Sequence, residues 1–222
     1  EESITIDVSG LTLEAADGAS PTVSPPESNG RTDTITVSAN GVTVQGLDVE
    51  ATGGSTPRGI VLNADDTSAL NNNVSHADSV PDKSRTGPLI AVAGGDNVTI
   101  KANTATDGPI AYVGGNNNQV DFTNNTVEGE LVDEGFFALG GTDPVFTFTG
   151  NDFSAADTGQ DADVKFDLSS VTVDGATDAS AIVDTTRSDN NGVGVVEVDG
   201  DQFTDSETLF IQEGDDINTA ID

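Results

Sequence analysis

Short runs in which apolar and polar residues alternate recur along most of the chain, and clusters of Gly, Asn and Asp separate them. Alternation with a period of two is typical of β-strands that bury one face, and such clusters are typical of tight turns. The repeating part shows no helical period, so the pattern predicts an all-β chain. The clearest strand signals are at residues 35–37, 60–62, 89–92, 110–113 and 136–139.

A repeat appears when each apolar residue that is followed three positions later by Asn is aligned with the others. Successive repeats are 22 to 30 residues apart. One such unit is too short to bury its own apolar side chains, whereas stacked units share a continuous core. The repeat therefore predicts a β-solenoid with one rung per unit. The pairs are Leu70 with Asn73, Ile100 with Asn103, Phe122 with Asn125 and Phe148 with Asn151; Val44 with Leu47 matches with Leu in place of Asn.

The repeated Asn residues predict a structural ladder at one corner of the solenoid. Asn tolerates left-handed backbone angles at a tight bend. Stacked Asn amides can hydrogen-bond from one rung to the next, as they do in cross-β assemblies. We expect the ladder to consist of Asn73, Asn103, Asn125 and Asn151 and to be lost after Asn151.

The segment Asn97-Val98-Thr99-Ile100, followed by Asn103, resembles the repeat of right-handed, pectate-lyase-type solenoids. The closer resemblance is to their NosD-like, carbohydrate-binding and sugar-hydrolase branch, found on secreted proteins. It covers residues 1–155 well and residues 156–222 loosely. The resemblance implies a right-handed parallel β-helix, of about eight or nine rungs at roughly 26 residues each.

We expect regular rungs with the Asn ladder in residues 1–155, and less regular rungs with a terminal capping or junction segment in residues 156–222. A small terminal subdomain is the alternative for the second part. Strand signals in this part are at residues 164–168, 171–173, 182–183, 193–198 and 209–211. The nine Phe residues are expected to fill the core, Phe122, Phe146, Phe148 and Phe153 among them.

The two ends of the chain look complementary. Residues 217–222 read I-x-x-A-I-D, which resembles the short helix that caps the first rung in the family, and residues 1–6 resemble the strand that follows such a cap. In one interpretation, residues 209–222 cap the next unit of a tandem array or filament; in the other, they close their own end. Residue 1 is Glu, so we expect a processed product or a fragment. The expected junction comprises Ile4, Ile6, Val8, Leu11 and Leu13 with Leu209, Ile211, Ile217 and Ile221.

Charge narrows the classes of partner. The chain has 39 acidic and 7 basic residues and a net charge of −32, and Asp outnumbers Glu 28 to 11. Such a surface repels nucleic-acid phosphates and anionic lipids, and no apolar run is long enough to span a bilayer. Because the Debye length falls to about 3 Å at 1 M salt, we expect adaptation to very high salt, as in extreme halophiles.

Metal chemistry has few candidate residues. The absence of Cys excludes disulfides and thiolate ligands, and a single His excludes a two-histidine site. Calcium takes oxygen ligands, for which Asp199, Asp201 and Asp205 are candidates, although their spacing lacks the closing Glu of a twelve-residue loop. No cofactor is firmly implied beyond calcium or bound salt cations.

One region carries candidate catalytic residues, between Asp65 and Arg85. Pectin-cleaving β-helix hydrolases use an Asp pair, a Gly-His-Gly motif and an Arg-x-Lys motif on neighbouring rungs. Here His76 lies in Ser-His-Ala, and Lys83 precedes Arg85 rather than following it. We therefore predict no catalytic residues and interpret this region as a charged loop. The residues concerned are Asp65, Asp66, His76, Asp78, Asp82, Lys83 and Arg85.

Three N-glycosylation sequons begin at Asn73, Asn97 and Asn124. The motif matters only on the surface of a secreted protein. Asn97 and Asn124 are expected to face solvent. Asn73 is expected to be unmodified because it belongs to the predicted ladder.

Together these features predict an extracellular, structural β-solenoid module of a surface filament, appendage or adhesin. Its partners would be copies of itself, assembled head to tail in high salt, and glycans or a cell surface as further contacts. A glycan-binding or glycan-degrading β-helix is the alternative, and a viral fibre or spike of the same fold is another. Sparse exposed aromatic residues, with one Tyr and no Trp, disfavour a strong sugar-binding platform.

Overall fold

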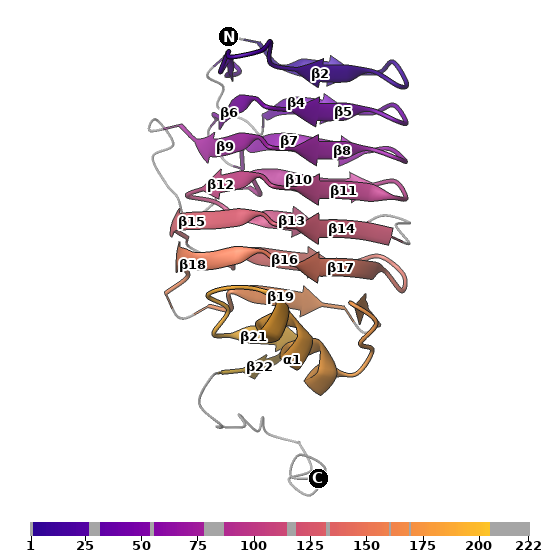
Figure 1. Cartoon of the computed structure of the whole chain (residues 1–222), viewed down its shortest axis with the longest axis vertical. Helices are drawn as coiled ribbons and strands as arrows, with labels where there is room; N and C mark the ends of the chain where they lie inside the picture. The colour runs from indigo at the N-terminus through magenta and orange to yellow at the C-terminus, as the bar shows by residue number, and fades with distance from the viewer. Residues whose placement is uncertain are drawn as a thin grey trace, which may run out of the picture.

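The chain winds into a coil of stacked turns, each turn contributing one strand to each of three parallel sheets (Figure 1). This computed structural model describes residues 2–26, 32–53, 56–77, 87–114, 119–131, 134–159, 161–168 and 170–204. Up to β20, strands three apart in chain order are hydrogen-bonded neighbours in every sheet, which is the signature of a solenoid with three strands per turn. The predicted all-β solenoid is confirmed.

Sheet A contains the most strands, and all but the last pair are parallel. Its strands in the described chain are β1 (Ile4–Ile6), β4 (Asp33–Val37), β7 (Arg58–Asn63), β10 (Ile90–Gly94), β13 (Ile110–Tyr112), β16 (Phe136–Leu139), β19 (Val164–Asp167), β21 (Val196–Val198) and β22 (Asp201–Phe203). Eight of these nine strands run parallel, so the described coil has eight turns, in agreement with the predicted eight or nine.

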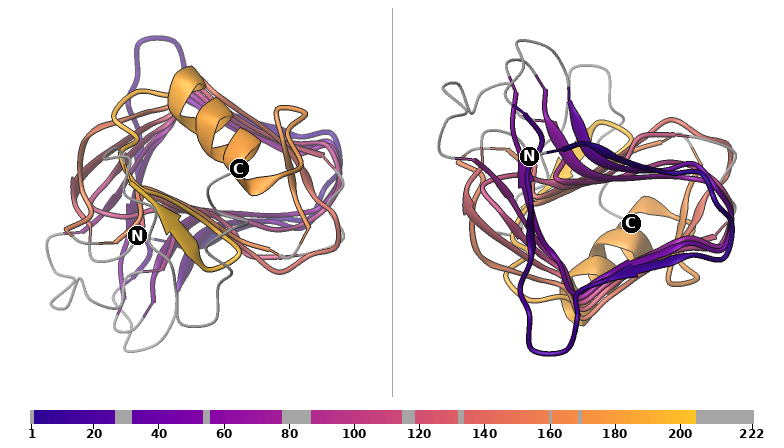
Figure 2. Two further views of the ribbon diagram at one scale, coloured as in Figure 1. Left: turned by 90° about the horizontal axis from the view of Figure 1, so that it is seen from below. Right: turned by 90° about the horizontal axis from the view of Figure 1, so that it is seen from above.

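Sheets B and C complete each turn. Sheet B consists of β2 (Thr12–Glu14), β5 (Thr43–Gln45), β8 (Ser68–Leu70), β11 (Val98–Lys101), β14 (Gln119–Thr123), β17 (Val145–Thr149) and β20 (Thr172–Val173). Sheet C consists of β3 (Thr22–Val23), β6 (Asp48–Ala51), β9 (Asn73–His76), β12 (Thr104–Thr106), β15 (Thr126–Glu130) and β18 (Asp152–Asp157). Seen from the N-terminal end, the chain runs clockwise as it recedes, so the coil is right-handed (Figure 2).

The core is a narrow column of side chains enclosed by the three sheets. Alternate residues of each strand point inward, and parallel pairing stacks them in register, as in the series Ile4, Ile35 and Ile60. Aromatic residues fill the fifth to seventh turns, where Phe122 meets Phe136 edge-on at 4.8 Å between ring centroids. The predicted core positions Phe122, Phe146, Phe148 and Phe153 are all buried.

An Asn ladder follows the corner between sheets B and C, one residue away from where the repeat placed its first member. The buried residue in the third turn is Asn72, whereas Asn73 is exposed and lies on the outer face of β9. The prediction for Asn73 was wrong because Leu70 looked like the inward apolar residue. Ala69 points inward instead, paired with Ile100, so the Asn three positions after it is Asn72.

The ladder also extends further than predicted. After Asn72, each Asn side-chain oxygen accepts from the backbone N–H and the side-chain amide of the Asn one turn earlier, at distances of 2.8 to 3.1 Å. The prediction that it ends at Asn151 was wrong, because Asn190 continues it after an interval of 39 residues. The complete ladder is Asn72, Asn103, Asn125, Asn151 and Asn190.

A helix replaces the sheet C strand in the seventh turn. Helix α1 (Ala179–Asp189) begins after Asp178, whose carboxylate accepts from the backbone N–H of Ala181, and buries Ile182 and Val183 against the end of the core. The strand predicted at residues 182–183 was therefore wrong. Asn190 follows the helix and donates to the carbonyl of Thr186, which joins the helix to the ladder. The last complete three-strand turn ends at Asp157.

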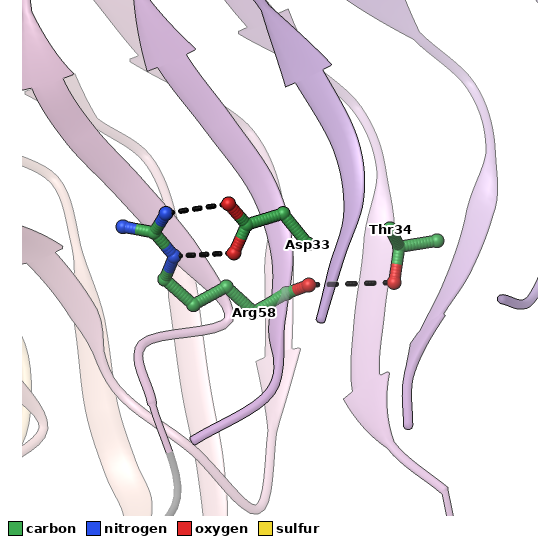
Figure 3. A network of polar contacts seen from close by, with 3 residues as sticks. All are labelled: Asp33, Thr34 and Arg58. Carbon is green, nitrogen blue, oxygen red and sulfur yellow. Dashed lines mark hydrogen bonds and ion pairs between the residues drawn. The ribbon is translucent and has the colours of Figure 1, made fainter. Parts of the chain in front are cut away.

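Arg58 and Asp33 form a charged pair at the start of sheet A (Figure 3). The Arg58 guanidinium donates from Nε and Nη2 to the two carboxylate oxygens of Asp33, at 2.7 and 2.6 Å. Thr34 donates its hydroxyl proton to the carbonyl oxygen of Arg58 at 3.3 Å and to that of Glu50 at 2.8 Å. Arg58 is buried, so the pair ties adjacent turns at a corner that little water reaches.

We expect Arg58→Met to lower the free energy of unfolding by about 2 kcal/mol, because the half-buried Asp33 carboxylate loses the two charged hydrogen bonds that Arg58 donates to it. Arg58→Lys should restore less than half, since an ammonium cannot make the two-point contact. Urea unfolding followed by circular dichroism measures both. Lys101→Met at an exposed position is the matched control, with an expected change within about 0.5 kcal/mol. Equal losses at the two positions would contradict this assignment.

Candidate functional site

The N-terminal end of the coil is open. Strands β1, β2 and β3 are the outermost strands of their sheets, and no described residue pairs with their outer edges. On the inner side they are fully engaged, for example where Ser38 and Thr43 donate backbone N–H groups to Ile6 and Leu11 at 2.9 and 3.0 Å. An unpaired strand edge presents N–H and C=O groups that another chain can bind.

Apolar side chains accompany these edges. Val8 is 59% exposed and Leu11 is 37% exposed, and Ile4 and Leu13 are only partly buried against the core. In contrast, Ile35 and Val44, which occupy the matching positions of β4 and β5 to Ile4 and Leu13, are completely buried. The first turn therefore covers the second and is itself less covered, although Ile6 within it is buried.

The opposite end is closed in the described chain. Helix α1 covers the core there, and β22 folds back antiparallel on β21, so that sheet A ends in a hairpin (Figure 1). Arg187, in the last turn of α1, connects the helix to the hairpin, because its Nη2 donates to the carbonyls of Gly194 and Phe203, both at 2.7 Å. The two ends of the coil are thus chemically different.

The predicted junction residues separate into two groups. Ile4, Ile6, Val8, Leu11 and Leu13 lie together on the open first turn, as expected from their place in the sequence. The other half of the predicted junction, Leu209, Ile211, Ile217 and Ile221, lies outside the described residues.

The structure does not bring the described members of the candidate catalytic region together. Asp65 and Asp66 are exposed at the corner between sheets A and B, whereas His76 is buried at the end of β9 in sheet C. Both carboxylates make structural hydrogen bonds: Asp65 accepts from the backbone N–H of Asp96 at 2.9 Å, and Asp66 accepts from the amide of Asn97 at 3.1 Å. Asp78, Asp82, Lys83 and Arg85 lie outside the described residues.

The predicted calcium ligands lie at the closing hairpin. Asp199 and Asp201 are exposed on either side of the β21–β22 turn, and Asp205 lies outside the described residues. Within the described ranges, no three His, Asp or Glu side chains gather closely enough to hold a metal ion.

Much of the Asp excess has an architectural role that charge counting missed. Five of the nine described non-glycine residues with positive φ are Asp, at positions 66, 107, 143, 174 and 199. Others accept backbone N–H groups across turns, as Asp163 does from Gly194 and Val195 at 2.8 and 2.9 Å. The short Asp side chain reaches such groups and tolerates the left-handed region, whereas Glu does not.

Burial and neighbouring charges shift the pKa values of two charged groups, Asp174 and Lys165. Burial raises the pKa of Asp174, and the nearby charges of Asp189 and Asp121 raise it further, against a hydrogen bond from the Phe148 backbone N–H that lowers it. For Lys165, burial lowers the pKa, but hydrogen bonds and attraction to Glu197 and Glu134, both at 3.1 Å, raise it overall.

Asp152 is the first residue of β18, the sheet C strand of the sixth turn. A hydrogen bond from Ser154 lowers its pKa. The charged form is therefore favoured at Asp152 in the sixth turn and disfavoured at Asp174 in the seventh.

Two features of the ends escaped the sequence reasoning. Asp178 followed by Ile182, Val183 and Thr186 has the cap and the i, i+1, i+4 spacing of a helix with one buried stripe, which is the signal for α1. Asn190 does not fit the repeat, because Arg187 and not an apolar residue lies three positions before it and the helix lengthens the interval from Asn151 to 39 residues.

Comparisons of the chain with protein-family models, with curated proteins and with solved structures give no match in any of the three. The resemblance to pectate-lyase-type solenoids therefore stays a prediction from the repeat. The α1 helix has 11 residues, and no helix in the described part is long and apolar enough to cross a membrane.

Proposed function

We propose that this protein is an extracellular, structural β-solenoid module that assembles head to tail with copies of itself into a filament or appendage in high salt. The observation that carries the proposal is the open first turn, whose three strands have unpaired outer edges and whose corner between β1 and β2 exposes Val8 and Leu11. A surface of this kind invites stacking of another β-rich end. The family resemblance, of the secreted pectate-lyase type, is part of the same proposal.

The place where the described chain ends supports a head-to-tail arrangement. The described chain ends at Thr204, beside β22 and at the opposite end from β1 (Figure 1). Residues 205–222 follow it and include the apolar residues of the predicted cap. Seven spacings of about 4.8 Å separate the first and eighth turns, roughly 34 Å. In a head-to-tail stack the segment begins next to the open turn of the following copy.

Electron microscopy and light scattering of the full chain in multimolar salt test the proposal. We expect filaments of regular subunit repeat whose mass rises with protein concentration, since a heterologous contact that does not close gives open assemblies. Dimers alone would contradict it, because two open ends meeting face to face form a closed, isologous contact. Monomers at all concentrations would also contradict it.

The high-salt part of the proposal rests on charge, and Asp174 provides a test of it. A raised pKa means that the protonated carboxyl stabilises the fold below its ordinary pKa of 3.8, and that this contribution is lost as the pH rises through the raised value. At pH 7 the charged form therefore costs stability. Asp174→Asn should stabilise the protein by on the order of 0.5 kcal/mol in low salt at this partly exposed site.

Urea unfolding at two salt concentrations and two pH values measures this effect. The part of the gain that comes from repulsion by Asp189 and Asp121 should be screened at about 1 M salt, whereas the part that comes from burial should remain. The whole gain should disappear at pH 3. Asp199→Asn is the matched control, since Asp199 has a similar left-handed backbone, with φ 49° against 48°, and lies in the β21–β22 turn. A gain that is the same in low and high salt would show that repulsion is not its cause.

A further inference from the structure

All three sequons place their Asn on the surface. Asn97 and Asn124 are exposed at corners of the coil, in left-handed conformations with φ 55° and 57°. Because the ladder runs through Asn72, Asn73 is also exposed, which removes the reason to expect it to be unmodified. Its Nδ2 donates to the Asp48 carboxylate at 2.8 Å, on the outside of sheet C.

The hydroxyl residue of each sequon lies on the outer surface as well. In a strand, residues two apart share a face, so Asn73 and Ser75 both point away from the core while Val74 between them is buried. Thr99 and Thr126 likewise occupy outer positions of β11 and β15, beside buried Val98 and Val127. At Asn73 the acceptor amide and the Ser75 hydroxyl therefore lie on the same face of β9, and the other two sequons also place their Asn and hydroxyl residues outside the core.

We propose that Asn73 is an N-glycosylation acceptor and that, with Asn97 and Asn124, it forms a glycan belt around the middle of the coil. In the reaction, Nδ2 attacks the anomeric carbon of an oligosaccharide carried on a lipid diphosphate. A carbon–nitrogen bond forms, the anomeric carbon–oxygen bond breaks, and the lipid diphosphate leaves. The amide loses one proton to a base of the transferase, and no oxidation or reduction occurs.

The modified amide is compatible with the fold. A glycosylated Asn keeps one N–H on Nδ2, which is what the hydrogen bond to Asp48 requires. The same holds for Asn97, whose Nδ2 donates to Asp66 at 3.1 Å. Neither side chain takes part in the buried ladder, so the glycans disturb no interior contact.

The positions of the three sites fit an assembly. Asn73, Asn97 and Asn124 belong to the third, fourth and fifth turns, and the sequence has no other sequon. The glycan belt therefore leaves both ends of the coil clear, the open first turn included. It also adds bulk and hydration to the sides, where filaments would otherwise meet laterally. This inference rests on the proposed extracellular location.

Mass spectrometry of the full chain, isolated from the medium or surface of the cells that produce it, tests the proposal. We expect an oligosaccharide mass on Asn73, Asn97 and Asn124 and none on exposed Asn40 or Asn71, which lack the motif. Ser75→Val should reduce occupancy of Asn73 by about tenfold or more, whereas Ser75→Thr should retain it, because only the hydroxyl completes the motif. Both residues suit an exposed strand position.

The outcomes separate this inference from the proposed function. An unmodified Asn73 in protein recovered from outside the cell would overturn the inference and leave filament formation untouched. Occupancy that persists in Ser75→Val would overturn it as well, since the modification would then not follow the sequon. Glycosylated protein that stays monomeric in high salt would instead overturn the assembly and leave the glycan belt in place.

Discussion

Replacing Asn72 by Leu is expected to lower the free energy of unfolding by about 2–5 kcal/mol, because two buried backbone groups lose their partners. The Asn72 side chain accepts from the Leu47 N–H at 3.1 Å and donates to the Val44 carbonyl at 3.0 Å. Leu fills a similar volume, so neither group gains a cavity that water could occupy. Each group left unsatisfied costs about 1–3 kcal/mol.

Asn73→Leu is the matched control, one residue further along and with the same change of side chain. Asn73 is exposed and bonds only to the Asp48 carboxylate on the surface. Its replacement should change stability by less than about 0.5 kcal/mol. Chemical unfolding of both variants measures the difference. A larger loss for Asn73→Leu would place the ladder at the residue that the sequence repeat suggested, and equal effects would contradict the special role of Asn72.

Asn72 and Asn73 show which parts of the fold could be predicted from the sequence and which could not. Alternation and the 22- to 30-residue repeat were sufficient for the solenoid, the sheet A strands and the Phe core, because those depend on many side chains at once. The register at one corner depends on a single comparison, Ala69 against Leu70. By size, Leu70 is the better candidate for the inward position, but the strand pairing places Ala69 there. A shift of one residue in register turns every side chain of a strand to the other face.

The C-terminal part was harder to predict because its elements do not repeat. A helix takes the place of a strand in the seventh turn, and Ile182 and Val183 are compatible with either structure over so short a run. The charge count similarly suggested one explanation for the Asp excess, adaptation to salt, whereas the structure adds a second, the formation of turns. Positions such as Asp163 and Asp174 hold turns together, so their acidity does not by itself report on the salt of the surroundings.

For the open end, the sequence could predict which residues form the first turn but not which of them are exposed. The sequence placed Val8 and Leu11 in the first turn, but their exposure depends on what neighbours that turn in space. The structure adds that α1 and the β21–β22 hairpin close the other end, which makes the two ends different. This difference is the reason to expect a polar stack, since two unlike surfaces can alternate indefinitely, whereas two like surfaces close a dimer.

Replacing Ile217 and Ile221 together by Asp is therefore expected to abolish filament formation in high salt, with loss of the high-mass species in light scattering. Two carboxylates at these apolar positions would have to be buried against Val8 and Leu11 of the next copy, at a cost that no partner charge offsets. Val8→Asp on the open turn should have the same effect from the other side of the contact.

Val145→Asp is the control for both changes. Val145 is 39% exposed at the start of β17 and lies on the side of the coil, in the sixth turn. It introduces the same charge into an apolar position away from the proposed contact, so filaments should persist. Unfolding curves of all variants should remain close to that of the parent chain, which separates loss of assembly from loss of fold. If filaments survive in the Ile217 and Ile221 variant but not in Val8→Asp, the open turn binds something other than this segment, and the head-to-tail junction must be built from the described ends alone.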